Sequence, residues 1–405
     1  MSELSYLEKL LDGVEVEWLP LGVLGELVRG NGLPKTDFTE AGIPAIHYGQ
    51  IYTFYGLSTE TTKSFVSQDT AKKLKKVNTG DVVITNTSEN LDDVGKALVY
   101  LGKEQAVTGG HATIFKPNKD IIGKYFAYFT QTNSFFNEKR KYSKGTKVID
   151  VSASDMAKIT IPIPCPNNPE KSLAIQSAIV RILDKFTELT AELTAELTAE
   201  LSMRKKQYNY YRDQLLSFND GEVECKTLRE IIQMRAGQHI STSKIMERRE
   251  DDYVYPCFGG NGIRGYVKQK SHDGEHLLIG RQGALCGNVK RMKGQFYATE
   301  HAVVVSALPG INIDWAFHML TAMNLNQYAS KSAQPGLAVG KLQELKLPVP
   351  SIKRQEYIAS ILDKFDMLTD SITEGLPREI ELRQKQYEYY RDLLFSFPKP
   401  EATSN

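Results

Sequence analysis

Two stretches of the chain carry apolar residues at helical spacing. From about Ile175 to Phe218 the sequence lacks Gly and Pro and is rich in Ala, Glu, Leu, Lys and Arg, which predicts one continuous helix. Its apolar residues recur every three or four positions and form one stripe that needs a partner helix. A second stretch, 354 to 397, carries a matching stripe. The residues predicted to pack are Phe186, Leu189, Leu193, Leu197 and Leu201 in the first stretch, and Phe365, Leu368, Ile372 and Leu376 in the second.

The two helical stretches are copies of each other. ILDKF occurs at 182–186 and at 361–365, and QYNYYRDQLLSF at 207–218 matches QYEYYRDLLFSF at 386–397. Both matches keep the same offset in numbering, so no gap separates them. The simplest arrangement that covers both stripes is an antiparallel pair within the chain. In the second copy, Gly375 to Pro377 predict a break, because proline fits the first turn of a new helix.

The first helical stretch contains the tetrad TAEL three times in succession, at 190–193, 194–197 and 198–201. Each tetrad adds ~6 Å of helix. Two interpretations remain open: the tetrads adjust the length of a spacer, or a slipped repeat is tolerated because any helix-forming tetrad fits.

The segments before the helices share a skeleton. GVEVEWLPL at 13–21 resembles DGEVECKTL at 220–228, and later TGGHATIF, IIGKYFAYF and ITIPIP correspond in order to ATEHAVVV, INIDWAFHM and LKLPVP. We therefore expect an α+β protein with two mixed α/β domains, two long antiparallel coiled-coil-like helices and a pseudo-twofold repeat. The expected segments are 1–17, which completes the helical repeat, domain 18–165, helical spacer 166–220, domain 221–350 and helical spacer 351–405. Because residues 5–17 resemble the end of the central helix, the termini should lie close together.

The charge is divided unevenly along the chain. Its formal net charge is only +1, but residues 18–165 hold 18 Lys and Arg against 14 Asp and Glu, and residues 225–350 hold 16 against 10. Ordinary fluctuation is one explanation. The other is that basic runs neutralise phosphates. The runs are Lys72, Lys73, Lys75 and Lys76; Lys139, Arg140, Lys141, Lys144 and Lys147; and Lys290, Arg291 and Lys293.

The sequence offers little catalytic chemistry. It contains no Walker A loop, HExxH, GxSxG or Cys/His metal cluster, and it lacks the catalytic tetrapeptide of amino-methyltransferases. Gly260, Gly262 and Gly265 match GxGxxG but precede YVKQK rather than a helix start, so we interpret them as turn glycines or as backbone that approaches a ligand closely. Asp92 and Asp93 have no second acidic partner at a useful spacing for a nuclease. These absences predict a binding protein that directs another protein's chemistry. The sequence has no recognisable export signal and no apolar stretch long enough to span a membrane, so we expect a cytoplasmic location.

Two variable domains ending in IPIP or LPVP, each followed by a helix with ILDKF and QYxYYRD, resemble the DNA-specificity subunit of type I restriction-modification systems over essentially the whole chain. The TAEL tetrads resemble the IC subclass. The resemblance implies a non-catalytic subunit whose two target-recognition domains read the halves of a bipartite, asymmetric sequence in double-stranded DNA. It also implies two modification subunits, which methylate adenine with S-adenosylmethionine, and two restriction subunits, which use ATP and magnesium. No cofactor or metal is expected on this chain.

Within this family, base contacts should come from polar side chains on loops. The candidates in the first domain are His47, Tyr48, Asn86, Tyr142 and Lys144, and those in the second are Asn261, Arg264, Arg281, Gln282 and Asn288. Two other classes remain open, an enzyme with an unrecognised site and a coiled-coil assembly protein without a role in DNA binding.

Overall fold

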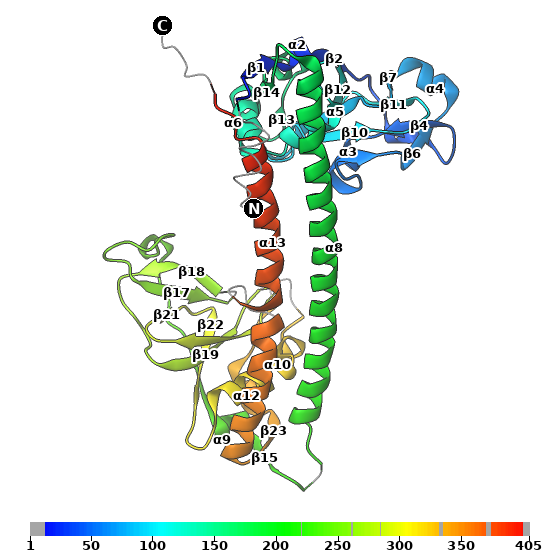
Figure 1. The fold of residues 1–405 in the computed structure, drawn as a ribbon. Helices are drawn as coiled ribbons and strands as arrows, with labels where there is room; N and C mark the ends of the chain where they lie inside the picture. Colours follow the sequence, from blue (N-terminus) through cyan, green and yellow to red (C-terminus); the bar gives the residue numbers. More distant parts are fainter. Residues whose placement is uncertain are drawn as a thin grey trace. The chain divides into compact units, whose positions relative to one another are not determined.

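The computed structural model describes residues 13–219, 221–260, 262–283, 285–331, 335–369 and 374–399. The chain forms two compact units: residues up to 195 with residues from 381 on, and residues 196–380. Each unit contains one α/β domain, part of a long helix and a segment from the other helical copy (Figure 1). We describe each unit by itself. The predicted closeness of the two termini concerns ends of the chain that lie outside the described residues.

The first domain is built from two five-stranded sheets. The main sheet has the order β2-β12-β8-β10-β5, and the outer sheet has the order β3-β6-β4-β11-β7. The main sheet consists of β2 (Gly25–Arg29), β12 (Ala112–Pro117), β8 (Val82–Thr85), β10 (Ala97–Tyr100) and β5 (Ser58–Thr59). The outer sheet consists of β3 (Phe38–Thr39), β6 (Ser64–Val66), β4 (Ile43–Ile46), β11 (Ala106–Thr108) and β7 (Lys75–Val77).

Short elements complete this domain. Strand β1 (Val16–Pro20) pairs antiparallel with β14 (Thr160–Pro164), and β9 (Thr87–Ser88) pairs with β13 (Ile149–Asp150). The helices are α2 (Leu21–Leu24), α3 (Tyr48–Thr53), α4 (Gln68–Lys73), α5 (Gly123–Phe129), α6 (Asn133–Tyr142) and α7 (Ala153–Met156). Every residue of α5 except Lys124 is buried. Phe395 and Phe397, from the end of the chain, join the same hydrophobic core.

The second domain repeats this plan with fewer strands. Its main sheet has the order β16-β22-β19-β20, and its small sheet has the order β18-β17-β21. The strands are β15 (Glu224–Thr227), β16 (Ile232–Ala236), β17 (Tyr255–Gly259), β18 (Gly262–Val267), β19 (Glu275–Gly280), β20 (Val289–Lys293), β21 (Tyr297–Ala298), β22 (Ala302–Ala307) and β23 (Lys346–Val349). The helices are α9 (Leu228–Ile231), α10 (Ile313–Ala322) and α11 (Val339–Gln343).

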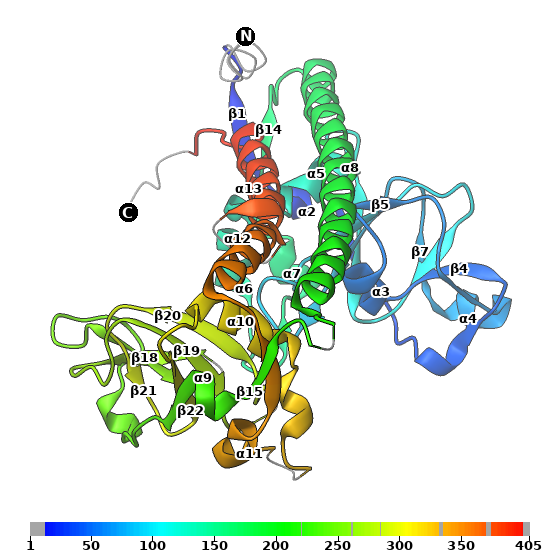
Figure 2. The same ribbon diagram turned by 90° about the horizontal axis from the view of Figure 1, so that it is seen from below.

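Strand pairing confirms that the two domains are one repeated fold. The antiparallel pair β1 and β14 corresponds to β15 and β23, and the sheet β2-β12-β8-β10 corresponds to β16-β22-β19-β20. The parallel pair β4 and β11 likewise corresponds to β17 and β21. In both views the outer sheet of the first domain and the small sheet of the second domain each lie away from the long helices of their own unit (Figures 1 and 2).

The central helix is continuous, as predicted. Helix α8 spans Pro169–Leu216 and begins earlier than the predicted Ile175, because Pro169 suits the first turn of a helix. The second copy is broken, also as predicted, into α12 (Ile352–Thr369) and α13 (Gly375–Leu394). Gly375 has φ of +80°, and a Cβ there would lie 2.5 Å from the carbonyl oxygen of Met367, so glycine is required at the break.

Each unit contains a contact between the helical copies. In the first unit the rings of Phe186 and Tyr390 lie 5.8 Å apart, and in the second the rings of Phe365 and Tyr211 lie 5.6 Å apart. These are equivalent pairs, because the offset that relates the two repeats exchanges their members.

The most buried helical residues are not those of the predicted stripe. Ile179 and Leu183, with their counterparts Ile358 and Leu362, are 0% exposed, and they pack into the cores of their own domains. Leu189 of the predicted stripe is 47% exposed, and Ile372 lies outside the described residues.

Candidate nucleic-acid interface

Loops at two strands converge at one end of the main sheet in the first domain. His111 directly precedes β12, and Asn86 and Thr87 directly follow β8. The Asn86 backbone N–H donates to the His111 carbonyl at 2.9 Å, and the Thr87 hydroxyl lies 3.2 Å from His111 Nδ1. The Tyr48 ring lies 4.8 Å from the His111 ring. An exposed imidazole is therefore held in place by two neighbouring loops.

The second domain has the same arrangement at the same end of its sheet. His301 directly precedes β22, and the Arg281 backbone N–H donates to its carbonyl at 2.9 Å. Gln282 Oε1 lies 2.7 Å from His301 Nδ1, as the Thr87 hydroxyl does near His111. His111 and His301 are thus equivalent residues in two domains whose other loops differ.

Glycine allows the loops to approach closely in both domains. A Cβ at Gly30, after β2, would lie 2.0 Å from the carbonyl oxygen of Gly109, and a Cβ at Gly237, after β16, would lie 2.3 Å from that of Thr299. No side chain fits at these distances. The same close approach of loops, with a histidine and a glycine at equivalent positions, therefore occurs at the end of the main sheet in both domains.

The first domain surrounds this point with aromatic rings. The ring centroids of His47 and Tyr48 are 4.7 Å apart, and those of Phe38 and His47 are 5.5 Å apart. His47 caps α3 by accepting from the Gly49 backbone N–H at 3.2 Å. Burial, with the charges of Lys35 and His111, lowers the pKa of His47, so the ring is neutral at pH 7. Neutral aromatic rings favour contacts with bases or sugars over ion pairs with phosphate.

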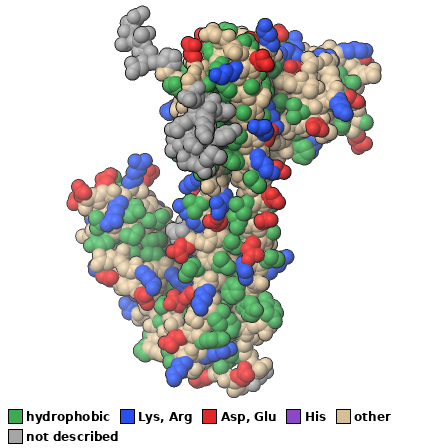
Figure 3. Space-filling view, viewed as in Figure 1, with side chains coloured by type: hydrophobic (Ala, Val, Ile, Leu, Met, Phe, Trp, Pro, Cys, Tyr) green, Lys and Arg blue, Asp and Glu red, His purple; other side chains and the backbone are tan. Residues whose placement is uncertain are grey.

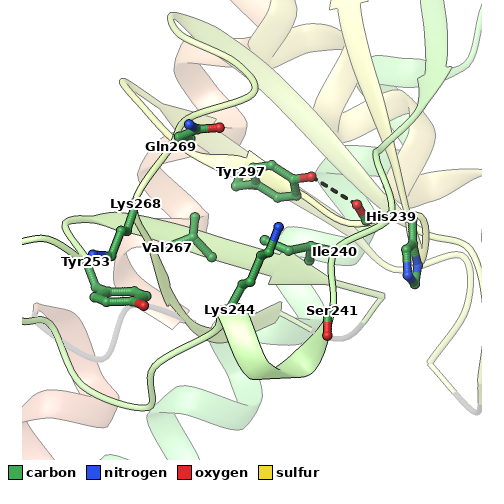
Figure 4. Close-up of a pocket in the computed structure, with 9 residues that line it drawn as sticks. All are labelled: His239, Ile240, Ser241, Lys244, Tyr253, Val267, Lys268, Gln269 and Tyr297. Carbon is green, nitrogen blue, oxygen red and sulfur yellow. Dashed lines mark hydrogen bonds between the residues drawn. The ribbon is translucent and has the colours of Figure 1, made fainter.

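The second domain instead has a cavity of about 600 Å³ next to the same loops (Figure 4). Figure 4 shows Lys244 and Tyr297 directed toward one space, with the Tyr297 hydroxyl donating to the His239 carbonyl at 3.3 Å. Lys268 lies over the Tyr253 ring at 4.9 Å and pairs with Asp252 at 2.8 Å. The lining residues are His239, Ile240, Ser241, Lys244, Tyr253, Val267, Lys268, Gln269 and Tyr297. Aromatic and cationic side chains together suit a nucleic acid.

A carboxylate also lies in the second cluster. Glu300 Oε1 is 3.1 Å from His239 Nδ1 and 3.3 Å from His301 Nε2. Its pKa is lowered: burial opposes ionisation, but a backbone hydrogen bond and both histidines outweigh it. The first domain has Gly110 at this position, so the two clusters differ in charge as well as in ring content.

Three predicted contact residues are occupied inside the protein. Asn86 is 0% exposed, and its amide donates to the Val151 carbonyl and accepts from Thr113. Lys139 is 4% exposed, and its ammonium donates to the carbonyls of Asp92 and Val94. Burial lowers the pKa of Lys139 to about 8. We therefore remove Asn86, Lys139 and Arg291, whose contacts are given below, from the expected DNA contacts.

The remaining predicted residues lie in several places. Tyr48, Arg281 and Gln282 belong to the sheet-end clusters, and His47 is next to Tyr48. Tyr142 is half-buried against the core, and the Lys144 ammonium pairs with Asp155 at 2.9 Å. Asn261 lies outside the described residues. Lys76 is half-buried and donates to the Ala71 carbonyl at 2.7 Å. The exposed predicted residues are Lys72, Lys73, Lys75, Arg140, Arg264, Asn288 and Lys290.

Sequence reasoning missed His111, His301 and the Lys244, Tyr253 and Tyr297 group. The first two were visible in the sequence, because HATIF and HAVVV align with histidine in the same place. No pattern in the sequence indicated the third group, whose members are brought together by the small sheet.

Among the described residues, one group has the ligand types of a metal site: His318, Asp363 and Asp366. Arg291 occupies its centre, because its guanidinium pairs with Asp363, lies 3.0 Å from His318 Nε2 and 3.2 Å from Asp314, and covers the Phe317 ring at 4.1 Å. A guanidinium at this position excludes a cation, so we interpret the group as an internal ion-pair network.

The surface itself does not mark one interface. On the face drawn in Figure 3, Lys and Arg side chains alternate with Asp and Glu. None of the helices in the described part of the chain has a stretch long and apolar enough to cross a membrane.

Comparison with known proteins gives a consistent result. The family model described as "Type I restriction modification DNA specificity domain" matches twice, at residues 14–203 and 221–382. The chain is 60% identical over 387 residues to the Escherichia coli type I restriction enzyme EcoprrI specificity subunit, covering 92% of this chain and 93% of that one. It is 41% identical to the E. coli EcoR124I/EcoR124II specificity subunit, covering 100% of both chains.

Solved structures agree on the fold. The chain is similar to the S subunit of a type I restriction-modification system from M. genitalium, with a TM-score of 0.51, 16% identity and coverage of 96% of this chain and 98% of the other. It is also similar to a solved structure that describes the structural basis of complex assembly and conformational transition of the type I R-M system, with a TM-score of 0.63, 15% identity and coverage of 94% of this chain and 97% of the other. The matches to the family model and to the two E. coli subunits show that the chain belongs to the family of specificity subunits of type I restriction-modification systems, in agreement with the resemblance found in its sequence.

Proposed function

We propose that this chain recognises an asymmetric bipartite sequence in double-stranded DNA and directs adenine methylation and restriction by partner subunits. The supporting observation is the sheet-end cluster, which occurs once in each domain with the same backbone geometry but different surroundings. One histidine is next to Tyr48 and the other is next to Glu300 and Gln282. Two readers with one framework and unlike side chains suit two unlike half-sites.

The clusters suggest a division of labour within each domain. The sugar-phosphate backbone is common to both half-sites, whereas the bases differ. The repeated His111 and His301 therefore contact the backbone, and the differing neighbours read bases: Tyr48 in the first domain, and Arg281, Gln282 and the Lys244 group in the second. Phosphate contacts fix the register of a protein on DNA, and base-edge contacts provide the sequence preference.

The helices provide the spacing between half-sites. Helix α8 has 48 residues, a length of ~72 Å, and half-sites read from one side of the duplex are ~34 Å apart. The chemistry belongs to the partners: two modification subunits with S-adenosylmethionine, and two restriction subunits with ATP and magnesium. This chain contributes recognition and assembly.

Mapping of methylated adenines in cells tests the proposal. Arg281→Ala with Gln282→Ala should relax the sequence preference in one half-site only, because a good base contact provides ~1 to 3 kcal/mol of discrimination. Tyr48→Ala should affect only the other half-site. Lys119→Ala is the control, because this exposed lysine follows the opposite end of β12 from His111. Simultaneous relaxation of both half-sites by either variant would contradict independent readers, and methyl transfer by the purified chain alone would contradict the non-catalytic role.

A further inference from the structure

We propose that the second domain recognises the 5-methyl group of a thymine, and that Leu285 and Ile263 are the side chains that contact this methyl group. The inference rests on the proposed function, because it concerns the half-site that the second domain reads. It adds one chemical group of the DNA and the residues that detect it.

Leu285 is an exposed apolar residue at the end of the main sheet. It lies in the turn between β19 and β20, and it is 45% exposed. Arg281 and Gln282 precede it in the same turn, and exposed Asn288 follows it. An apolar side chain among residues placed to contact base edges suits the thymine methyl, which is the apolar group that a base presents in the major groove.

A second exposed apolar residue lies on the adjoining turn. Ile263, near the start of β18, is 54% exposed. The two turns are in contact, because a Cβ at Gly280 would lie 2.2 Å from the carbonyl oxygen of Gly260 and 3.0 Å from that of Leu285. A Cβ at Gly260 would likewise lie 3.0 Å from the carbonyl oxygen of His301. Both apolar residues therefore lie on the loops of the sheet-end cluster.

The turn that carries Leu285 is fixed by hydrogen bonds on both sides. The neighbouring Cys286 is 0% exposed. Its backbone N–H donates to the Gly283 carbonyl at 3.0 Å, and Asn326 Nδ2 donates to the Cys286 carbonyl at 2.9 Å. The Gly283 N–H donates to the Pro335 carbonyl at 2.9 Å. Because a preorganised turn loses little conformational freedom on binding, a contact with one methyl group can change the affinity measurably.

The cations beside Ile263 and Leu285 favour DNA over a protein as the occupant. Exposed Arg264 directly follows Ile263, and a Cβ at Gly262 would lie 2.9 Å from Lys290 Nζ. Phosphates flank the bases on both sides of a groove, so cations next to an apolar pair match the order of groups across the major groove. A contact with a partner protein is an outcome that the experiment below distinguishes.

Duplexes in which deoxyuridine replaces single thymines test the proposal, because deoxyuridine keeps the base pair and lacks only the methyl group. The chain is purified with its modification subunits, and the duplexes carry the half-sites found by methylation mapping. In the half-site that Arg281→Ala with Gln282→Ala relaxes, one replacement should weaken binding by about fourfold, the effect of one methyl group left unburied. The double variant Leu285→Ala with Ile263→Ala should bind the thymine and deoxyuridine duplexes equally.

Ile352→Ala is the matched control, because this residue is 41% exposed in the same unit but lies at the start of α12, and it should keep the difference between the duplexes. Unchanged unfolding followed by Trp315 emission would show that each variant is folded. Equal binding of both duplexes by wild type at every thymine of that half-site would overturn the proposal, as would the same difference in the double variant. Loss of the modification subunits from the double variant would assign the apolar pair to a protein contact and would also overturn it. If wild type bound no duplex, the proposed function itself would fail.

Discussion

Replacement of His318 by Gln should make the second unit less sensitive to acid. His318, on α10, is 0% exposed. Its Nε2 lies 2.9 Å from Asp363 and 3.0 Å from Arg291, and its Nδ1 lies 4.0 Å from Asp366 and 3.4 Å from the Tyr208 hydroxyl. Burial, together with the charge of Arg291, lowers the pKa of His318 to about 4, although Asp363 opposes the shift.

The sign and size follow from proton linkage. The unfolded chain binds a proton at this histidine below pH 6.5, but the folded chain does so only near pH 4. The contribution of the neutral His318 to the free energy of unfolding is therefore fully present above pH 6.5 and is lost as the pH falls from 6.5 to 4. The loss amounts to about 2 kcal/mol by pH 5 and about 3 kcal/mol by pH 4. Glutamine does not titrate, so its variant lacks this dependence.

Fluorescence can isolate the second unit. The chain has two tryptophans, Trp18 in the first unit and buried Trp315 in the second. In a Trp18→Phe background, urea unfolding followed by Trp315 emission at pH 7.5 and 5 gives the free energy of unfolding of the second unit. The difference between the two pH values should be about 2 kcal/mol smaller in His318→Gln. An equal pH dependence in both proteins would refute the assignment.

Three further predictions follow from repeated features. Gln355→Ala should lower the stability of the second unit by about 2 to 4 kcal/mol, because this buried amide accepts from the Asn312 N–H and donates to the Pro350 carbonyl at 2.8 Å each; unfolding followed by Trp315 emission measures it, and a loss under ~0.5 kcal/mol, typical of a surface site, would contradict it. His111→Ala and His301→Ala should each weaken DNA binding by the chain without changing the preferred sequence, which affinity measurements with matched and mismatched half-sites would show. Deletion of one TAEL tetrad removes ~6 Å of helix and should change the spacer between unchanged half-sites, as methylation mapping would reveal; an unchanged spacer would favour the slipped-repeat interpretation.

The sequence predicted what depends on regular spacing. The common offset of the helical repeats, the continuous central helix and the break at Gly375 follow from composition and from backbone limits of Gly and Pro. The sequence did not predict which face of the long helices is most deeply buried. Ile179 and Leu183 are covered by a domain, whereas the leucine stripe after Phe186 is only partly covered. Periodicity identifies an apolar face but does not identify what covers it.

Polar side chains were the least predictable. Lys139 stands in a run of basic residues that resembles a solvated face, yet its ammonium binds two carbonyls of a loop that is distant in the sequence. Asn86 is likewise occupied by Val151 and Thr113. Such partners come from distant segments, so local sequence gives no indication of them. Comparison of the two halves of the chain was more informative, because it would have singled out His111 and His301.

The junction between domain and helix shows how the halves diverged. In the first unit, Lys124 pairs with Asp184 of α8 at 2.8 Å, and the Tyr128 hydroxyl donates to the same carboxylate. At the equivalent positions the second unit has Asp314, Asp363 and His318, so the lysine has been replaced by a carboxylate.

In the second unit Arg291 takes the place of the missing lysine, and it lies on strand β20 rather than on helix α10, the counterpart of α5. The charge of the helical aspartate is thus compensated in both units, but by a side chain that belongs to the domain. A domain transplanted between such subunits must therefore carry its own cation: Arg291 with Asp314, or a lysine at the position of Lys124. A domain with Asp314 and no arginine would place three carboxylates together and should fail to dock on the helix.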